Sequence, residues 1–222
     1  MRIYTCSKIN LKKIKKYTEP NFNYKKIPYI DDSFSLVGYF QSYKYFQHNF
    51  EYIKNIMNID KLRNDILRKN KHIFEGKTVI SAHIRLGDYL KLVKINVIHS
   101  VEYYIMAIKH IIEHMSLEEQ HVKILIIYEK QYADYVQVNF IKHINIKNVE
   151  IEHVDHSLDD WEQMLLMSCC DHNIIASSTF SWWGAYLNTN ENKIVCYPEK
   201  WFGEKLKHID TSDMFPCDWK LI

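Results

Sequence analysis

The stretch Thr78-Val79-Ile80-Ser81-Ala82-His83-Ile84-Arg85-Leu86-Gly87-Asp88-Tyr89 decides how the fold of this chain is interpreted. Its first half is apolar and rich in β-branched residues, which is typical of a buried strand. A histidine, an arginine, a glycine and an aspartate follow at once. A guanidinium fits a phosphate through paired hydrogen bonds, and glycine permits a tight turn. Because open α/β sheets bind ligands at the carboxyl ends of their strands, we expect an anion-binding corner here.

Further strands and helices are expected to alternate after this corner. Short apolar runs predict strands, and apolar residues at three- and four-residue spacing predict helices. Such alternation is typical of a parallel sheet covered by helices on both faces, so the expected fold class is α/β. The expected strands cover residues 78–84, 123–128, 149–154, 173–176 and 193–196, and the expected helices cover 102–114, 132–140, 160–170 and 180–187, the third with Asp159 or Asp160 as its cap.

An aromatic stripe precedes the first of these strands. From Gly38 onward, apolar residues recur at helical spacing, and we expect a helix whose apolar face lies mainly in the core. A face of this kind that stays partly uncovered would seek a partner, which leaves a homo-oligomer as an open alternative. The residues of the stripe are Tyr39, Phe40, Tyr43, Phe46, Phe50, Ile53 and Met57.

Composition and charge argue against several classes of protein. The chain has 222 residues, of which 47% are hydrophobic and 25% charged, which is enough for one large domain. Its net charge of +2 does not indicate a nucleic-acid binder. The sequence contains neither the long apolar run of a membrane span nor the apolar core of a signal peptide, so we expect a cytoplasmic location. The five cysteines lack metal-ligand spacing and favour free thiols.

The N-terminal residues differ in character from the rest. Lysine and arginine dominate the first 30 residues, where Glu19 is the only acid. Such a segment is typical of a basic patch that binds RNA or an acidic membrane surface, or else of a solvated and loosely ordered arm. We favour the arm, because Pro20 and Pro28 argue against a continuous helix.

A second polar cluster follows the expected strand at 173–176. Ser177, Ser178 and Thr179 stand between this strand and the helix that begins near Phe180. Their hydroxyls either cap the helix, with a tryptophan pair filling the core, or donate to a phosphate at the helix N-terminus. Because parallel strands end at one edge of the sheet, we expect this cluster to lie near Arg85. The combination of the two favours a shared nucleotide pocket. The five glycines are isolated, so no glycine-rich phosphate loop can form.

Two motifs together carry a family resemblance. His83-x-Arg85-x-Gly87-Asp88-Tyr89 and Ser178-Thr179-Phe180-Ser181-Trp182-Trp183-Gly184-Ala185 resemble the α-1,2-fucosyltransferases of glycosyltransferase family 11. The resemblance extends over residues 36–222. Further segments that resemble the family, in the same order along the chain, are residues 38–46, 100–104, 166–175, 198–201 and 216–219.

The resemblance implies a fold of the GT-B type, in which a Rossmann-like C-terminal domain binds GDP-fucose. It also implies inverting transfer of fucose to a hydroxyl of a galactoside-type glycan acceptor, through an α-1,2 linkage. The sequence holds no Asp-x-Asp pair that would place a metal on the diphosphate. We therefore expect no metal and no cofactor besides the donor substrate, with Arg85 and the helix end neutralising the leaving GDP.

Roles for individual residues follow from the resemblance as hypotheses. Arg85 would bind the β-phosphate, while Asp88 would orient Arg85, contact fucose or act as the base that takes the acceptor proton. Glu102 is a second candidate base. His83 either hydrogen-bonds the nucleotide or is a core histidine at a strand end. The other expected substrate-binding residues are Gly87, Tyr89, Glu162, Ser178, Thr179, Phe180, Ser181 and Trp182. Many members have an acidic residue at the position of Gln163 that could contact the guanine, and either Glu162 or Asp160 would substitute for it here.

The resemblance weakens toward the N-terminus. The family normally opens with a Gly-Gly-Leu-Gly-Asn-Gln-like loop, whereas this chain has no adjacent glycines. We expect a divergent basic arm at 1–35, a remnant of the acceptor-side domain with linking helices at 36–76, and a Rossmann-like GDP-fucose domain at 77–222. The main alternative is a non-catalytic GDP-sugar-binding remnant without the acceptor half. A transferase for another GDP-sugar and a nucleic-acid-binding α/β protein are the remaining classes.

Overall fold

The computed structural model describes residues 14–31, 33–117 and 120–222, and it divides the chain into two compact units. The first unit is Met1–Phe50 with Ile209–Pro216, and the second is Glu51–His208 with Cys217–Ile222. Much of the expected basic arm, including Cys6, lies outside the described residues. The first unit takes in a C-terminal segment that the divisions expected after residues 35 and 76 did not include.

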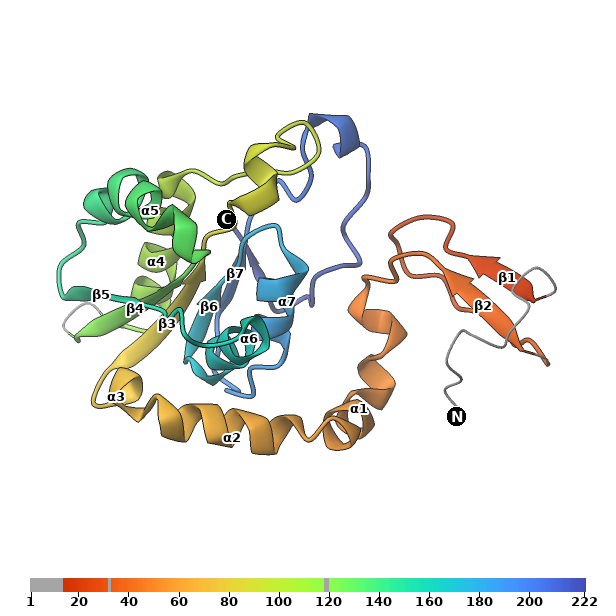
Figure 1. The fold of residues 1–222 in the computed structure, drawn as a ribbon, viewed down its shortest axis with the longest axis horizontal. Coiled ribbons are helices and arrows are strands. Elements are labelled where there is room, and N and C mark those ends of the chain that lie inside the picture. Colours follow the sequence, from red (N-terminus) through yellow and green to blue (C-terminus); the bar gives the residue numbers. More distant parts are fainter. Residues whose placement is uncertain (1–13, 32, 118–119) are drawn as a thin grey trace. The chain divides into compact units, whose positions relative to one another are not determined.

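A six-stranded sheet forms the centre of the second unit, and every pair of neighbouring strands in it is parallel (Figure 1). The expected α/β class is confirmed. The strand order β5-β4-β3-β6-β7-β8 is that of a doubly wound sheet, in which the chain runs outward from β3 to β5 and then crosses back to β6. The strands are β3 (Thr78–His83), β4 (Val122–Ile127), β5 (Val149–His153), β6 (His172–Ile174), β7 (Val195–Tyr197) and β8 (Lys220–Leu221).

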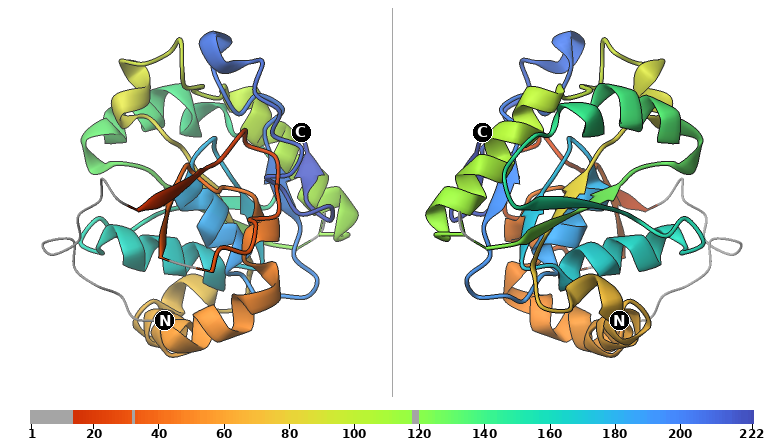
Figure 2. Two further views of the ribbon diagram at one scale, coloured as in Figure 1. Left: turned by 90° about the vertical axis from the view of Figure 1, so that its right-hand side faces the viewer. Right: turned by 90° about the vertical axis from the view of Figure 1, so that its left-hand side faces the viewer.

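Helices cover both faces of this sheet, and α4 and α6 lie on opposite sides of the strands (Figure 2). The four helices expected after residue 100 are present. Helices α2 and α3 lie within residues 36–76, for which linking helices were expected without individual bounds; charged residues outnumber apolar ones in α2, and α3 is a single turn. Among the described residues, no helix is long and apolar enough to cross a membrane. The helices are α1 (Phe50–Ile56), α2 (Ile59–Lys69), α3 (Lys71–Phe74), α4 (Val101–His114), α5 (Ala133–Asn139), α6 (Asp160–Cys169) and α7 (Thr179–Tyr186).

The core of the second unit lies mainly between the sheet and helices α4 and α5. Ile108 and Ile111 of α4 are fully buried there with Ile80 of β3 and Ile124 of β4. On the other face a buried amide ties three elements together. Asn173 of β6 donates through Nδ2 to Ser81 Oγ at 2.7 Å and to the carbonyl of Met167 in α6 at 2.8 Å.

The cysteines in the described part of the chain are free thiols, as expected. They are Cys169, Cys170, Cys196 and Cys217.

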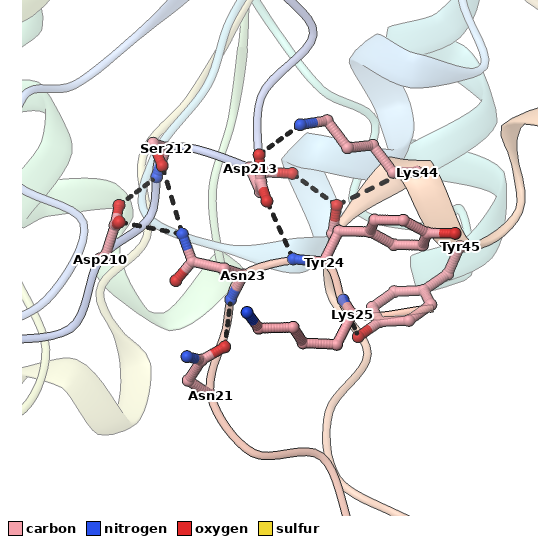
Figure 3. Close-up of polar contacts among 10 residues, drawn as sticks. Asn21, Asn23, Tyr24, Lys25, Lys44, Tyr45, Asp210, Ser212 and Asp213 are labelled. Carbon is pink, nitrogen blue, oxygen red and sulfur yellow. Dashed lines mark hydrogen bonds and ion pairs between the residues drawn. The ribbon is translucent and has the colours of Figure 1, made fainter. Parts of the chain in front are cut away.

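The first unit holds a two-stranded parallel sheet and a polar network. Strand β1 (Lys15–Thr18) pairs with β2 (Phe34–Val37). Figure 3 shows how Asp213 fixes the segment 209–216: its carboxylate accepts the backbone N–H of Tyr24 at 2.9 Å and pairs with Lys44. The carbonyl of Asp213 also accepts the hydroxyl of Ser42 at 2.7 Å. These contacts explain why the C-terminal segment belongs to this unit.

The expected helix from Gly38 onward is wrong for the residues before Phe50. Phe40 has a left-handed backbone with φ of +49°, which a continuing α-helix does not allow. Between Phe40 and α1, the described residues form 3₁₀ turns at Tyr43–Tyr45 and Gln47–Asn49. The expectation that the stripe lies mainly in the core is also wrong, since Tyr39 is 75% exposed and Met57 is 59% exposed. Helical spacing of apolar residues indicates an apolar face, but it does not indicate whether another part of the protein covers that face.

We expect Ile111→Ala to destabilise the second unit by about 2–5 kcal/mol, because a fully buried side chain would leave a cavity under α4. Met106→Ala on the same helix removes a side chain that is 53% exposed and should change stability by about 0.5 kcal/mol or less. Urea unfolding measures both values. Equal losses in the two variants would contradict the assignment of the buried face.

Candidate functional site

Arg85 lies just beyond the carboxyl end of β3, at the point where the strand order of the sheet reverses. In the parallel registers, His83 is paired with Ile127 of β4, and Ala82 is paired with Ile174 of β6. Continuing these registers places Arg85 level with Glu129 on one side and with Ser177 on the other. Three loops therefore meet at this edge, which is where doubly wound sheets hold their ligands.

The Arg85 guanidinium is held by two carboxylates and one ring. Nη1 donates to Glu129 Oε1 at 2.5 Å, and Nη2 donates to Asp88 Oδ1 at 2.5 Å. The guanidinium carbon also lies 5.2 Å from the centre of the Tyr89 ring, a cation–π arrangement. The side chain keeps 31% of its surface exposed, so it is fixed in position and still accessible.

The two carboxylates on Arg85 differ in how firmly they are held. The Glu129 side chain is 23% exposed, and its Oε2 also accepts the backbone N–H of Leu86 at 3.3 Å. The Asp88 side chain is 57% exposed. An incoming anion would therefore displace Asp88 more readily than Glu129.

Gly87 has a left-handed backbone conformation that favours glycine. Its φ is +40°, and a Cβ built on it would lie 2.7 Å from Glu129 Oε1. The turn therefore brings the backbone against the carboxylate that holds Arg85. Glu129 itself was not expected from the sequence. The available signal was its place directly after the expected strand at 123–128, level with Arg85 on the neighbouring strand.

The structure brings the arginine motif and the serine loop together. The Tyr89 hydroxyl donates to the carbonyl of Ser177 at 2.7 Å. The rings of His83 and Phe180 lie 5.0 Å apart. The Ser177 side chain is itself occupied, because its Oγ lies 2.7 Å from His99 Nε2 and donates to the carbonyl of Lys200 at 3.0 Å.

The residues of the serine loop divide into two groups. Ser178 is the N-cap residue of α7, but its side chain makes no capping hydrogen bond, and Thr179 is exposed. Ser181, by contrast, is fully buried and donates back to the carbonyls of Ala176 and Ser178. Ser181 therefore stabilises the first turn of α7, while the helix N-terminus carries the hydroxyls of the exposed Thr179 and of Ser178, which is 8% exposed.

Trp182 also has a packing role. It is 4% exposed and stacks on Tyr186, with ring centres 4.7 Å apart. Its ring centre lies 5.5 Å from that of Trp219 in the C-terminal residues. This position in the interior explains the residue without a ligand contact.

His83 is a buried and uncharged histidine. Burial, and secondarily the neighbouring Arg85, lower its pKa to about 3. Its Nδ1 is buried and has no hydrogen-bond partner within the described residues, although most buried polar atoms have one. Its backbone carbonyl accepts the hydroxyl of Tyr104 at 2.9 Å. The strand end is therefore fixed, and a neutral imidazole lies beside the arginine.

The two expected glutamates occupy helix N-termini. Glu102 is exposed in the first turn of α4, and a hydrogen bond from Ser100 together with a backbone N–H lowers its pKa. Glu162 belongs to the capping box of α6, in which its Oε2 accepts the backbone N–H of Asp159 at 3.0 Å. Its Oε1 pairs with Lys69 at 3.2 Å. One oxygen of Glu162 therefore caps α6, and the other links α6 to α2 through Lys69.

Comparison with known proteins identifies the family. The sequence matches Glycosyl transferase family 11 over residues 4–222, so the chain belongs to this family. The match begins well before residue 36, where the resemblance was expected to start. The match therefore includes the lysine-rich segment.

Two curated relatives come from Escherichia coli. The O-antigen biosynthesis glycosyltransferase WbnK is 34% identical over 191 residues, which is 83% of this chain and 60% of that protein. The alpha-1,2-colitosyltransferase is 25% identical over 190 residues, which is 84% of this chain and 62% of that protein. The chain thus spans about 60% of the length of these relatives.

Among solved structures, the NodZ alpha-1,6-fucosyltransferase co-crystallised with GDP is similar at 19% identity and a TM-score of 0.36, over 58% of this chain and 41% of that one.

The buried His83 should make stability depend on pH in a defined window. The unfolded chain binds a proton at this side chain near pH 6.5, whereas the folded chain does not until pH falls to about 3. Stability is therefore lost as pH falls through this window. Between pH 7 and pH 5, we expect the wild type to lose about 2 kcal/mol more unfolding free energy than His83→Gln does.

Urea titrations at the two pH values measure this difference. The exposed His208 provides the control, because His208→Gln should follow the wild type at both values. A His83→Gln variant that also loses stability in parallel with the wild type would contradict the neutral buried imidazole.

Proposed function

We propose that the Arg85 corner binds the diphosphate of a GDP-sugar, and that this site serves the transfer of fucose from GDP-fucose to a hydroxyl of a glycan. The observation that carries the proposal is the meeting of Arg85 with the α7 N-terminus at the switch point of a doubly wound sheet. This is where such sheets bind nucleotides. Membership of Glycosyl transferase family 11 supplies the class of reaction. The proposed whole-protein architecture is of the GT-B type, with the second unit as its nucleotide-binding part.

The diphosphate would bind by taking the place of one of the two carboxylates that contact Arg85. Asp88, the more exposed partner, would release Nη2 of Arg85 to the β-phosphate, while Glu129 keeps Nη1 in place. The first turn of α7 adds free backbone N–H groups and the positive end of a helix dipole. The hydroxyls of Ser178 and Thr179 would donate from the same end. His83, Gly87, Tyr89 and Phe180 would line the site, with the unpartnered Nδ1 of His83 facing a polar group of the nucleotide.

In the transfer step, the bond between the anomeric carbon and the β-phosphate oxygen breaks, and its electron pair leaves with GDP. The acceptor oxygen forms a new bond to that carbon from the opposite face, which inverts its configuration. Arg85 and the α7 end would stabilise the growing charge on the phosphate, an effect of several kcal/mol in preorganised sites. The acceptor proton passes to a carboxylate. Asp88, freed from Arg85, is our first candidate, and Glu102, whose lowered pKa makes it a weaker base, is the second.

The donor sugar and the acceptor are further parts of the proposal. Fucose is our proposed donor sugar, and colitose is the competing one because a relative at 25% identity is an alpha-1,2-colitosyltransferase. The relative at 34% identity takes part in O-antigen biosynthesis, which supports a bacterial surface glycan as the acceptor class. The proposed acceptor residue is a galactoside and the proposed linkage is α-1,2.

The proposal is tested by incubating the chain with GDP-fucose and measuring free GDP with and without β-galactoside acceptors. Release of GDP that depends on the acceptor supports the transferase. Thermal stabilisation by GDP without any release would instead show a non-catalytic GDP-sugar-binding protein. If GDP neither binds nor is released, the assignment of the Arg85 corner is wrong.

We expect Arg85→Ala to lower GDP-fucose turnover by about 10²–10³-fold, because the charge that develops on the leaving phosphate would lose its fixed partner. The matched control is Arg68→Ala, which removes an exposed arginine of α2 that also pairs with a nearby aspartate. The control should turn over GDP-fucose at the wild-type rate. Wild-type turnover by Arg85→Ala would refute the proposed role of the arginine.

We expect Gly87→Ala to weaken GDP binding about tenfold, because the added Cβ would push Glu129 away from Arg85. Gly76→Ala is the matched control, since Gly76 also has a left-handed backbone, with φ of +67°, but a Cβ there meets no atom within 4 Å. Both variants should lose about 1–2 kcal/mol of stability from the backbone alone. Calorimetric titration with GDP separates the two effects, and equal GDP affinities would argue against a role for the Glu129 contact.

A further inference from the structure

Tyr39 is an exposed aromatic side chain on a firmly held piece of backbone. It is 75% exposed although its ring has a stacking partner. Its neighbours Gly38 and Phe40 have φ values of +156° and +49°. A positive φ in a bulky residue such as Phe40 is strained, and such strain persists only where the surrounding structure enforces it.

The side chain of Glu19 holds the backbone of Tyr39 and Phe40 in this conformation. Its Oε2 accepts the backbone N–H of Tyr39 at 2.7 Å and that of Phe40 at 3.0 Å. A Cβ on Gly38 would lie 2.4 Å from the Glu19 Cβ, so only glycine allows this approach. The carboxylate therefore sets the direction of the chain at Tyr39 and leaves the ring itself uncovered.

Aromatic contacts brace the ring from behind. Tyr39 stacks on Phe22 with ring centres 5.7 Å apart and planes inclined by 21°. Phe40 packs edge-on against Tyr45 at 5.2 Å, and Tyr45 packs against Tyr24 at 4.9 Å. The backbone of Tyr24 is in turn held by Asp213, as Figure 3 shows. We call the stacked pair of Tyr39 and Phe22 the aromatic platform.

We propose that the aromatic platform binds a pyranose ring of the glycan acceptor, so that the first unit contributes acceptor recognition; this rests on the proposed function. One face of a galactose ring gathers several C–H groups into a flat apolar patch, which fits a flat exposed aromatic ring. Tyrosine suits such a contact because it offers rigid apolar area at low entropic cost together with a polar tip. Asn21 and Asn23 flank Phe22 in the sequence and fix its backbone, since Asn21 Oδ1 accepts the backbone N–H of Asn23 at 3.2 Å and Asn23 Nδ2 donates to Asp210 Oδ2 at 2.9 Å.

The test is a titration of the whole chain with lactose and longer β-galactoside oligosaccharides, with binding measured by saturation-transfer NMR. A parallel titration measures the affinity for GDP. Tyr39→Ala and Tyr39→Leu should weaken oligosaccharide binding about five- to tenfold, because neither keeps a flat ring. Tyr39→Phe should bind within about twofold of the wild type. Tyr29→Ala is the matched control, since Tyr29 lies in the same unit and is 90% exposed. None of the four variants should change GDP affinity.

Each outcome has a defined meaning. Wild-type oligosaccharide affinity in Tyr39→Ala and Tyr39→Leu, or the same loss in Tyr29→Ala, overturns the platform. So does GDP binding by the wild type without any oligosaccharide binding, and in that case the donor site still stands. A wild-type chain that binds oligosaccharides but not GDP instead refutes the proposed function. A change of oligomeric state in Tyr39→Ala, measured by light scattering, would show that a second copy covers the platform, and would also overturn the proposal.

Discussion

The parallel register of β3 with its two neighbours is the constraint on which the rest of the structure depends. Because β3 is paired with β4 on one side and β6 on the other, the residues that directly follow these three strands lie side by side at one edge of the sheet. A shift by one residue would turn His83 and the apolar residues of β3 to the wrong faces. The register thus brings an arginine, a glutamate and a helix N-terminus to one edge, although they are separated by more than 40 residues in the sequence.

The Arg85 guanidinium has ionic partners before any ligand arrives. It pairs with both Asp88 and Glu129, and the adjacent His83 stays uncharged because it is buried next to the guanidinium. A phosphate that replaced the exposed Asp88 would leave the number of ion pairs on Arg85 unchanged, so the guanidinium could keep its position during binding.

The sequence predicted the second unit better than the first. Apolar strands such as 123–128 and the helix at 102–114 are recognisable because burial on a parallel sheet leaves a continuous apolar pattern. The proximity of Arg85 to the serine loop could be predicted from strand ends alone. Glu129 directly follows an expected strand, but its pairing with Arg85 depends on the register of β4 on β3. Ser181 and Glu162 were expected at the ligand because their residue types suit it, and only the structure shows that their oxygens serve α7 and α6.

The structure of the first unit was not predicted from the sequence, for two physical reasons. The left-handed backbone at Phe40 interrupts a pattern that otherwise has helical spacing, and a carboxylate distant from it in the sequence enforces the interruption. The polar network around Asp213 joins residues nearly 190 positions apart, which no local pattern reveals. Both features depend on tertiary contacts of single polar side chains.

The most direct measurement of the central claim is a crystal structure of the chain with GDP bound. The account predicts the β-phosphate within hydrogen-bonding distance of the Arg85 guanidinium and at the N-terminus of α7, with Asp88 released from Nη2 and Glu129 still on Nη1. GDP bound at another place, or bound while Arg85 keeps both carboxylates, would contradict it.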